Sequence, residues 1–363
     1  MRRIVLDNKV VLITGAAGFI GSNLAVRLLE KIENITIVGI DNMNDYYDVS
    51  IKEYRLLQVQ KLADSVSGIF KFIKADISDK ETVQVLFSGY QPDLVVNLAA
   101  QAGVRYSIIN PDAYINSNLK GFYNILEACR HSYDSGAKGV EHLVYASSSS
   151  VYGKSKNIPY SIHEKIDNPI SLYAATKKSN ELMAYAYSQL YGIPSTGLRF
   201  FTVYGPAGRP DMAYFDFTNK LLANKNIQIF NYGNCMRDFT YIDDIVEGVS
   251  RVMEGVPEKG KDEEGESVPP YAIYNIGNSQ PINLVRFVEI LQQELARAKV
   301  LPSNYDFEAH KELVPMQPGD VPVTYADVSE LERDFKFKPS TPLEIGLRRF
   351  AEWYKEFYCN DRR

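Results

Sequence analysis

A glycine-rich turn near the N-terminus constrains the fold of this chain more than any other feature of the sequence. It reads Thr14-Gly-Ala-Ala-Gly-Phe-Ile-Gly21 and lies between a β-branched apolar run at 9–14 and a leucine-spaced segment at 22–31. We expect a buried strand before the turn and a helix after it. Glycines permit a tight turn, and the free N–H groups of a helix N-terminus bind phosphate. The pattern predicts that a dinucleotide pyrophosphate contacts Gly15, Gly18, Phe19, Ile20 and Gly21.

Apolar runs and helical segments alternate along the first 200 residues. Further strands are expected at 35–41, 70–76, 94–99, 142–147 and 196–201, and helices between them at about 50–63, 79–88, 111–133 and 171–191. Such alternation implies parallel strands joined by right-handed crossovers. We therefore predict an α/β fold with a Rossmann-type doubly wound parallel sheet.

The regular alternation ends after residue 205. We predict an NAD-binding domain over 1–200, with returning segments at about 239–277, and a smaller α/β substrate-binding region on the C-terminal side, over 201–238 and 278–363. The charged, apolar-poor stretch 256–270 is expected to be a mobile surface loop.

Composition and charge exclude several classes of protein. A net charge of −5 argues against a nucleic-acid partner, and no apolar run reaches the length of a membrane span. Three widely spaced cysteines offer neither a disulfide framework nor a zinc site, and His131, His142, His163 and His310 lack metal-ligand spacing. The N-terminus does not resemble a signal peptide. We expect a cytoplasmic protein without a metal.

Acidic residues follow two of the predicted strands. Asp41 closes the second strand, 20 residues after Gly21, where a carboxylate accepts hydrogen bonds from ribose hydroxyls and repels a 2′-phosphate. NAD is therefore favoured over NADP. Asp76 and Ile77 close the third strand, where an adenine edge is expected. Alternatively, Asp76 is the N-cap of the helix at 79–88.

Tyr173 and Lys177 stand four residues apart in a predicted helix, so both project from one face. A lysine ammonium beside a tyrosine lowers the phenol pKa, which is near 10 when unperturbed, and so favours acid–base chemistry (about 10,). The pair alone is weak evidence, but Ser147-Ser-Ser-Ser150 lies at a strand end upstream, with Ser148 25 residues before Tyr173. Ligands bind at such strand ends.

The sequence resembles the extended short-chain dehydrogenase/reductases that modify nucleotide sugars, on the glycine turn, Ser147-Ser-Ser-Ser-Val-Tyr-Gly153 and Tyr173-x-x-x-Lys177. Four further motifs resemble UDP-glucuronate 4-epimerases. They read Asp41-Asn-Met-Asn-Asp-Tyr-Tyr-Asp48, Ala99-Ala-Gln-Ala-Gly-Val-Arg-Tyr-Ser107, Phe200-Phe-Thr-Val-Tyr-Gly-Pro-x-Gly-Arg-Pro-Asp-Met212 and Arg237-Asp-Phe-Thr-Tyr-Ile-Asp-Asp244. The resemblance covers about residues 10–355. It departs at Ala207, where those enzymes usually carry an aromatic residue, and in the insertion-like stretch 256–270.

The resemblance implies a reversible oxidation of the sugar at C4, with NAD as a bound catalyst. Tyr173 is expected to move the proton of the 4-hydroxyl, Ser148 to bond the same oxygen, and Lys177 to tune Tyr173 and hold the nicotinamide ribose. Ser149 has an alternative claim on the role of Ser148. We also assign cofactor contacts to Asn42, Leu98, Ala99, Ala100, Ser117 and Phe200.

A uronic acid requires recognition of its carboxylate, and the resemblance points to Arg209, assisted by Thr202, Ser149, Ser150 and Arg105. The alternative for Arg209 is an ion pair within its loop. Arg237 resembles a diphosphate contact, with a salt bridge to Asp243 or Asp244 as the alternative. Asp320 resembles a contact to the ribose side of UDP.

Three other functions compete with UDP-glucuronate 4-epimerisation to UDP-galacturonate. UDP-glucuronate decarboxylases and UDP-hexose 4-epimerases use the same oxidation, whereas an NAD-sensing scaffold would not need Tyr173, Lys177 and the serines together. The resemblance also implies a homodimer through the helices at 111–133 and 171–191. Their apolar residues could equally pack on the sheet, and we interpret Tyr185, Tyr187 and Tyr191 as packing residues of the helix at 171–191.

Overall fold

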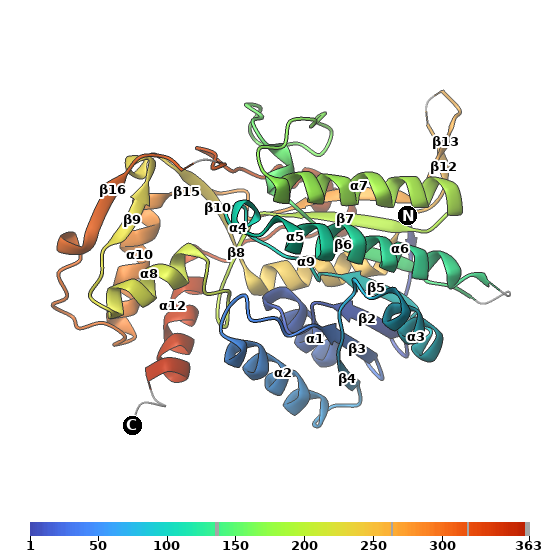
Figure 1. Cartoon of the computed structure of the whole chain (residues 1–363), viewed down its shortest axis with the longest axis horizontal. Helices are drawn as coiled ribbons and strands as arrows, with labels where there is room; N and C mark the ends of the chain where they lie inside the picture. Colours follow the sequence, from blue (N-terminus) through green and yellow to red (C-terminus); the bar gives the residue numbers. More distant parts are fainter. Residues whose placement is uncertain (135–137, 263, 318, 360–363) are drawn as a thin grey trace.

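The computed structural model describes residues 1–134, 138–262, 264–317 and 319–359. Its centre is a seven-stranded parallel sheet in the order β14-β7-β6-β5-β2-β3-β4 (Figure 1). The strands are β2 (Val10–Thr14), β3 (Thr36–Asp41), β4 (Ile69–Lys74), β5 (Leu94–Asn97), β6 (His142–Ser148), β7 (Ser195–Phe200) and β14 (Tyr271–Ile276). The predicted doubly wound parallel sheet is confirmed.

The sheet order reverses between β2 and β5. The chain leaves β2 toward β3 and β4 on one side, and β5, β6 and β7 extend the sheet on the other. Ligands of open α/β sheets bind at such a switch point, at the carboxyl ends of the strands. The glycine turn directly follows β2, so the topology places it at this point.

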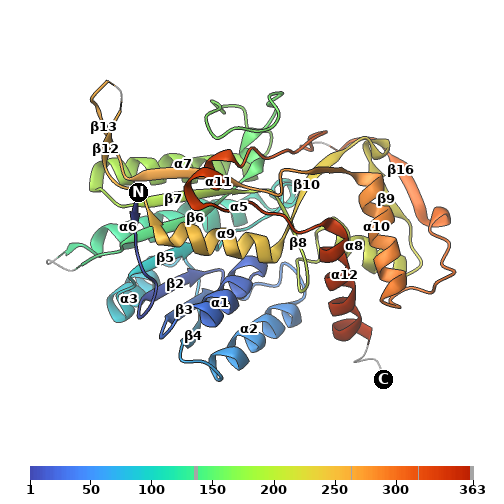
Figure 2. The same cartoon turned by 180° about the vertical axis from the view of Figure 1, so that it is seen from behind.

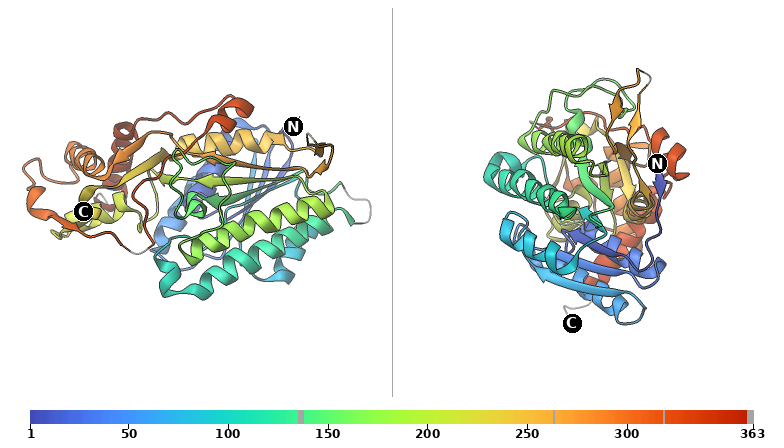
Figure 3. Two further views of the ribbon diagram at one scale, coloured as in Figure 1. Left: turned by 90° about the horizontal axis from the view of Figure 1, so that it is seen from above. Right: turned by 90° about the vertical axis from the view of Figure 1, so that its right-hand side faces the viewer.

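Helices cover both faces of the sheet, as Figure 3 shows from above. One face carries α1 (Phe19–Lys31), α2 (Val49–Ala63) and α9 (Ile242–Glu254), seen in front in Figure 2. The other face carries α3 (Lys80–Tyr90), α6 (Phe122–His131) and α7 (Leu172–Tyr191). Alternate strand residues point to opposite faces, so Val11 and Ile13 belong to one apolar cluster and Leu12 to the other.

Beyond β7 a smaller set of elements extends the molecule to one side (Figure 1). A three-stranded sheet joins β15 (Pro281–Asn283), β10 (Met236–Tyr241) and β8 (Thr202–Tyr204), and a parallel pair joins β16 (Lys311–Val314) and β9 (Ile227–Phe230). The helices here are α8 (Ala213–Leu222), α10 (Leu284–Arg297) and α12 (Leu343–Tyr354), whereas α11 (Ser329–Phe335) packs on β14. Tyr214, Phe215 and Phe350 join this part to the larger apolar cluster.

Several predicted boundaries are wrong by a few residues. The strands predicted at 70–76 and 94–99 end at Lys74 and Asn97, so Asp76, Ile77 and Ala99 lie in loops. The first helix begins at Phe19 and not at Ser22, because the last residues of the glycine motif already form the first turn of the helix.

The helix predicted at 111–133 is three segments: α5 (Pro111–Tyr114), a π-helical stretch (Ile115–Gly121) and α6. It follows the short helix α4 (Tyr106–Ile109). A π-helical turn changes which residues face the sheet, and such turns occur frequently at functional sites. Ser117 and Asn118 lie in this stretch.

The stretch 256–270 is not a plain loop. Gly255–Val256 (β11) pairs with Arg2–Arg3 (β1), and Gly260–Lys261 (β12) pairs with Ser267–Val268 (β13) in an exposed hairpin. Residue 263 lies outside the described residues. Within the described part of the chain, no helix is both long and apolar enough to cross a membrane.

Candidate functional site

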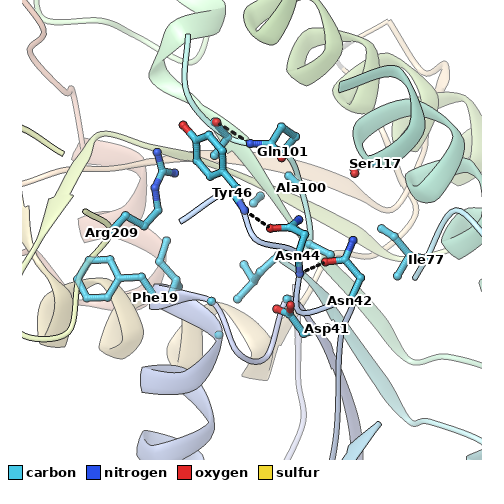
Figure 4. Close-up of a pocket in the computed structure, with 18 of the residues that line it drawn as sticks. Phe19, Asp41, Asn42, Asn44, Tyr46, Ile77, Ala100, Gln101, Ser117 and Arg209 are labelled. Carbon is cyan, nitrogen blue, oxygen red and sulfur yellow. Dashed lines mark hydrogen bonds between the residues drawn. The ribbon is translucent and has the colours of Figure 1, made fainter. Parts of the chain in front are cut away.

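A cavity of about 260 Å³ lies at the carboxyl ends of the strands around the switch point. Figure 4 shows Asp41, Asn42 and Ile77 toward one end of it and Arg209 toward the other. All the residues that the sequence assigned to the cofactor line it: Gly15, Gly18, Phe19, Ile20, Gly21, Asp41, Asn42, Asp76, Ile77, Leu98, Ala99, Ala100, Ser117, Tyr173, Lys177 and Phe200. Ser148 and Arg209 line it as well.

The glycine turn leaves no room for side chains. A Cβ on Gly21 would lie 2.2 Å from the carbonyl oxygen of Gly15, and one on Gly15, whose φ is +71°, would lie 2.8 Å from the backbone nitrogen of Ala99. Helix α1 starts from Gly18 without a side-chain cap, so its first N–H groups remain available toward the cavity. A pyrophosphate fits this cradle, because it needs close backbone approach and N–H donors.

Asp41 stands at the end of β3 as predicted. Its Oδ1 accepts a hydrogen bond from the Met43 backbone N–H at 2.9 Å and lies 3.7 Å from the Lys52 ammonium. Sequence reasoning missed Lys52, which is buried and donates to the carbonyl oxygen of Asn44 at 2.9 Å. No spacing pattern singled it out, because its partners come from the preceding loop. Lys52 fixes the loop beside Asp41 and balances the carboxylate charge.

Asp76 takes part in the cavity wall and not in a helix cap. It accepts hydrogen bonds from the Asn42 side chain at 2.9 Å and from the Ser78 backbone N–H at 2.8 Å. Burial raises the pKa of Asp76, but these hydrogen bonds outweigh burial and keep the pKa below its usual value. The alternative that Asp76 caps the following helix is wrong, since Asp79 is the N-cap of α3.

Tyr173 and Lys177 project from the first turns of α7 toward the cavity, and Ser148 faces them from the end of β6. Tyr173 shares a hydrogen bond with Ser148. Ser148 also accepts from the Ser150 backbone N–H at 3.2 Å, which starts a 3₁₀ turn over Ser149–Tyr152. Ser148, and not Ser149, is therefore the serine that contacts the tyrosine.

The predicted effect of Lys177 on the pKa of Tyr173 stays a prediction. Burial raises the pKa of Tyr173, while the Ser148 hydrogen bond and the positive charge of Arg209 lower it. Lys177 donates to the carbonyl oxygen of Ala146 at 2.9 Å, and burial lowers its own pKa to about 8. Arg209, which comes from a distant loop, is a further cation that lowers the pKa of Tyr173.

Arg209 forms a two-point ion pair with Asp211 at the other end of the cavity. Its Nε donates to Oδ1 at 3.0 Å and one terminal nitrogen to Oδ2 at 2.6 Å. The Tyr46 hydroxyl donates to the same Oδ2 at 3.2 Å. The structure therefore supports both alternatives for Arg209, because it lines the cavity and is paired within its loop. Tyr46 and Asp211 stand inside two of the family-like motifs, which was the signal that could have found them.

Arg237 and Asp320, both assigned to the UDP, form an ion pair with each other at 2.8 Å. The predicted alternative is wrong, because Asp243 pairs with Arg349 and Asp244 accepts from the backbone of Ser340 and Thr341. Arg237 and Asp320 lie outside the lining of the cavity described above.

Four other residues assigned to the substrate also lie outside that lining. Arg105 stacks its guanidinium over the Phe230 ring, with its central carbon 4.9 Å from the ring centre. Thr202 pairs with Phe239 in the small sheet, and Ser149 and Ser150 form the turn behind Ser148. In the described residues, no cluster of three or more His, Cys, Asp or Glu side chains could hold a metal ion.

Comparison with known proteins agrees with this geometry. The model of the NAD dependent epimerase/dehydratase family matches residues 11–277. The chain belongs to this family. The family, and NAD as its cofactor, are confirmed, and the glycine cradle and Asp41 are the residues here that fit the dinucleotide.

Relatives are similar over nearly the whole chain. The Staphylococcus aureus protein CapI is 49% identical over 96% of this chain and 99% of its own length, and UDP-glucuronate 4-epimerase 4 of Arabidopsis thaliana is 44% identical over 97% of this chain and 77% of its own. Among solved structures, a Bacillus cereus UDP-glucuronic acid 4-epimerase in complex with UDP-glucuronic acid and NAD has a TM-score of 0.80 at 29% identity. That match covers 96% of this chain and 100% of the other.

Proposed function

We propose that this chain is an NAD-dependent UDP-glucuronate 4-epimerase that interconverts UDP-glucuronate and UDP-galacturonate. The observation that carries the proposal is one cavity with a dinucleotide cradle, the Tyr173, Ser148 and Lys177 group, and Arg209 facing that group. Relatives named UDP-glucuronate 4-epimerases, 42–44% identical over at least 96% of this chain, support it.

The acid–base step follows from the contacts of Tyr173. Bound NAD supplies the reversible oxidation at C4 of the sugar. The Tyr173 oxygen takes the proton of the 4-hydroxyl as the ketone forms and returns it when the alcohol is restored. With the sugar bound, the Ser148 hydroxyl beside Tyr173 turns its single proton to the same sugar oxygen and keeps it in line.

The positive charge around Tyr173 favours its deprotonated form during this step. Arg209 already lowers the pKa of Tyr173 against the effect of burial. Lys177 is a buried residue of the cavity lining and is anchored to Ala146, so its side chain is held at a fixed place, where it would contact the nicotinamide ribose. Inversion at C4 further requires that the sugar turn its other face toward the same groups.

Arg209 distinguishes a uronate from a neutral hexose. A guanidinium has five N–H donors, and Asp211 occupies two of those of Arg209. The remaining three leave an end-on fork for a second carboxylate. We assign the diphosphate and ribose of UDP to the Arg237 and Asp320 pair, and the carboxylate also to Thr202, Ser149, Ser150 and Arg105.

Product analysis tests the proposal against the related reactions. Purified protein is incubated with UDP-glucuronate without added cofactor, and the anomeric signals are followed by NMR. We expect UDP-galacturonate to appear without pentose. Formation of UDP-pentose with carbon dioxide would instead identify a decarboxylase, and turnover of UDP-glucose alone a hexose epimerase. Absence of turnover even with added NAD would reject all three.

We also propose a homodimer through α6 and α7, which lie side by side on the outside of the molecule (Figure 3). Their outward faces expose Tyr123, Leu182 and Leu190, the last at 71% of its surface. Tyr187, in contrast, donates within the chain to Glu127. Light scattering of Leu182→Glu/Leu190→Glu tests this: a monomer is expected, and an unchanged mass would contradict the assignment.

The remaining sequence-based assignments stay proposals. Residues 1–200 with the segments at about 239–277 form the NAD-binding part, and 201–238 and 278–363 form the nucleotide-sugar part; residues 318 and 360–363 lie outside the described residues. The three cysteines are free, which supports a reducing, cytoplasmic location.

A further inference from the structure

Arg209 sits on a loop whose position is fixed from a distant part of the chain. The loop runs from the end of β8 to the start of α8, and Pro210 separates Arg209 from its partner Asp211. Neither residue belongs to a helix or strand. A flexible loop could not hold a guanidinium within the fraction of an ångström that selective recognition needs.

Arg55 holds the backbone beneath Arg209. This residue of α2 is buried, and its Nε and one terminal nitrogen donate to the carbonyl oxygens of Ala207 and Gly208 at 2.8 and 2.9 Å. Its other terminal nitrogen donates to the carbonyl oxygen of Ala17 at 3.0 Å and to the Tyr47 hydroxyl at 2.7 Å. One guanidinium thus joins the glycine turn, the loop after β3 and the Arg209 loop.

The Arg55 contacts also involve Ala207, the position where we expect the sequence to depart from the family pattern. Ala207 has a φ of +51°, a left-handed conformation that is costly for a residue other than glycine. The hydrogen bond from Arg55 to its carbonyl oxygen helps to hold this conformation. The side chain is small and buried, so the loop packs closely over α2.

Asp211 holds the side chain of Arg209, and Tyr46 holds Asp211. Tyr46 lies in the loop that follows Asp41, and its ring packs against Tyr106 with centres 4.6 Å apart. Figure 4 shows Tyr46 beside Arg209 in the cavity. Gly103, with a φ of +101°, approaches this pair so closely that a Cβ would lie 3.2 Å from the Tyr46 hydroxyl. The surroundings therefore leave the hydroxyl little freedom to turn away from Asp211.

We propose that Asp211, held by Tyr46 and supported by the Arg55 clamp, is the positioning residue that orients Arg209 for the substrate carboxylate. Through Asp211, Tyr46 and Arg55, the segments that line the cofactor end of the cavity also hold the opposite end in place. This opposite end, at Arg209, is the sugar end of the cavity. The pair also limits the net charge there, because the Asp211 carboxylate offsets the guanidinium until a second carboxylate arrives. The kinetic part of this inference rests on the proposed uronate substrate, whereas the placement of the loop does not.

The experiment compares Asp211→Asn, Asp211→Glu and Tyr46→Phe with the unaltered protein. Asp216→Asn is the matched control, because Asp216 is an exposed carboxylate on α8 that pairs with Lys220. Hydrogen exchange of the segment 205–212 measures loop order without any substrate. Turnover of UDP-glucuronate gives kcat and KM separately.

In Asp211→Asn we expect exchange in 205–212 to accelerate about fivefold. We expect kcat to fall about tenfold with KM unchanged or lower, because the freed guanidinium attracts the carboxylate but is no longer oriented. Asp211→Glu should recover most of the loss. Tyr46→Phe should act in the same direction and more weakly, and Asp216→Asn should behave as the unaltered protein.

Unchanged exchange and unchanged kcat in Asp211→Asn would overturn the proposal, as would a raised KM with an intact kcat. If Asp211→Asn does not fold, Tyr46→Phe decides the same question, since its ring still packs on Tyr106. If the unaltered protein does not turn over UDP-glucuronate, the proposed function fails, and hydrogen exchange alone still decides whether Asp211 and Tyr46 order the loop.

Discussion

Different interactions form the two ends of the cavity. At the cofactor end, backbone atoms at the ends of β2, β3 and β5 form the wall, and the sheet and the helices on its faces hold them in place. At the sugar end, the wall depends on charged side chains that pair across loops, chiefly Arg209 with Asp211 and Tyr46. Backbone geometry can offer one fixed shape, whereas paired side chains can exchange partners when a ligand brings its own charge.

This difference divides the work of the enzyme. A cofactor that stays bound through each turnover requires a constant cradle, and the steric limits at Gly15 and Gly21 provide one. In the proposed reaction the sugar rotates within the site and the product then leaves. Its contacts with the protein must therefore break and form again. The cofactor end should therefore respond to substitution with large losses in all reactions, and the sugar end with smaller and substrate-dependent ones.

The largest effect is expected where the two ends meet, at Tyr173. Tyr173→Phe removes the oxygen that moves the proton and should lower kcat about a thousandfold. NMR of the UDP-uronates measures the loss, with Tyr185→Phe, at an exposed position of the same helix, as control. A variant that keeps more than about a tenth of the activity would show that another group moves the proton.

Lys177 should reveal the cost of a buried charge at the cofactor end. Burial lowers its pKa from 10.5 to about 8, so the native protein binds fewer protons than the unfolded chain between these values. The free energy of unfolding contributed by this residue therefore rises with pH across that window, and the full cost of about 3 kcal/mol is present below it.

Urea unfolding of Lys177→Met tests this sign. At pH 7 the variant should be more stable than the unaltered protein, and the difference should vanish toward pH 10. Lys178→Met is the control, because Lys178 is more exposed and pairs with Glu181 at 3.2 Å. A difference that stays constant with pH would contradict the assignment of the shift to Lys177.

Gly21→Ala tests the rigidity of the cradle. A Cβ 2.2 Å from the Gly15 oxygen forces the turn open, which should cost about 1–3 kcal/mol of stability and weaken NAD binding about 10- to 100-fold. Calorimetry measures both. Gly89→Ala, on α3 with nothing within 4 Å, should instead stabilise by about 0.5–1 kcal/mol. Equal effects of Gly21→Ala and Gly89→Ala would contradict a rigid cradle at the cofactor end.

Arg209→Lys should give the smallest and most selective effect. A lysine keeps the charge but loses the fork, so KM for UDP-glucuronate should rise about tenfold while NAD affinity is unchanged. Arg286→Lys, at an exposed arginine of α10, is the control. If Arg209→Lys also lost affinity for NAD, the sugar end and the cofactor end would not act independently.

The sequence by itself determined the cofactor end. Buried strands are recognisable as β-branched runs, and the glycine turn gains its meaning from its place between such a strand and a helix. The positions of Gly15, Asp41 and Tyr173 relative to the sheet therefore followed from topology. All the residues predicted for the cofactor line the cavity, although Asn42, Leu98 and Ser117 among them were assigned from the family resemblance and not from topology. Local steric rules fix such features, and these rules act within a few residues.

Tertiary structure alone decided the sugar end. Arg237 lies beside Asp320 and not beside Asp243, and Arg209 pairs with Asp211. Charges can choose among many partners at similar cost, so spacing along the chain does not specify which pair forms. For the Arg209 loop, the contacts of Arg55 on α2 hold the backbone at Ala207 and Gly208, and no local pattern reveals them.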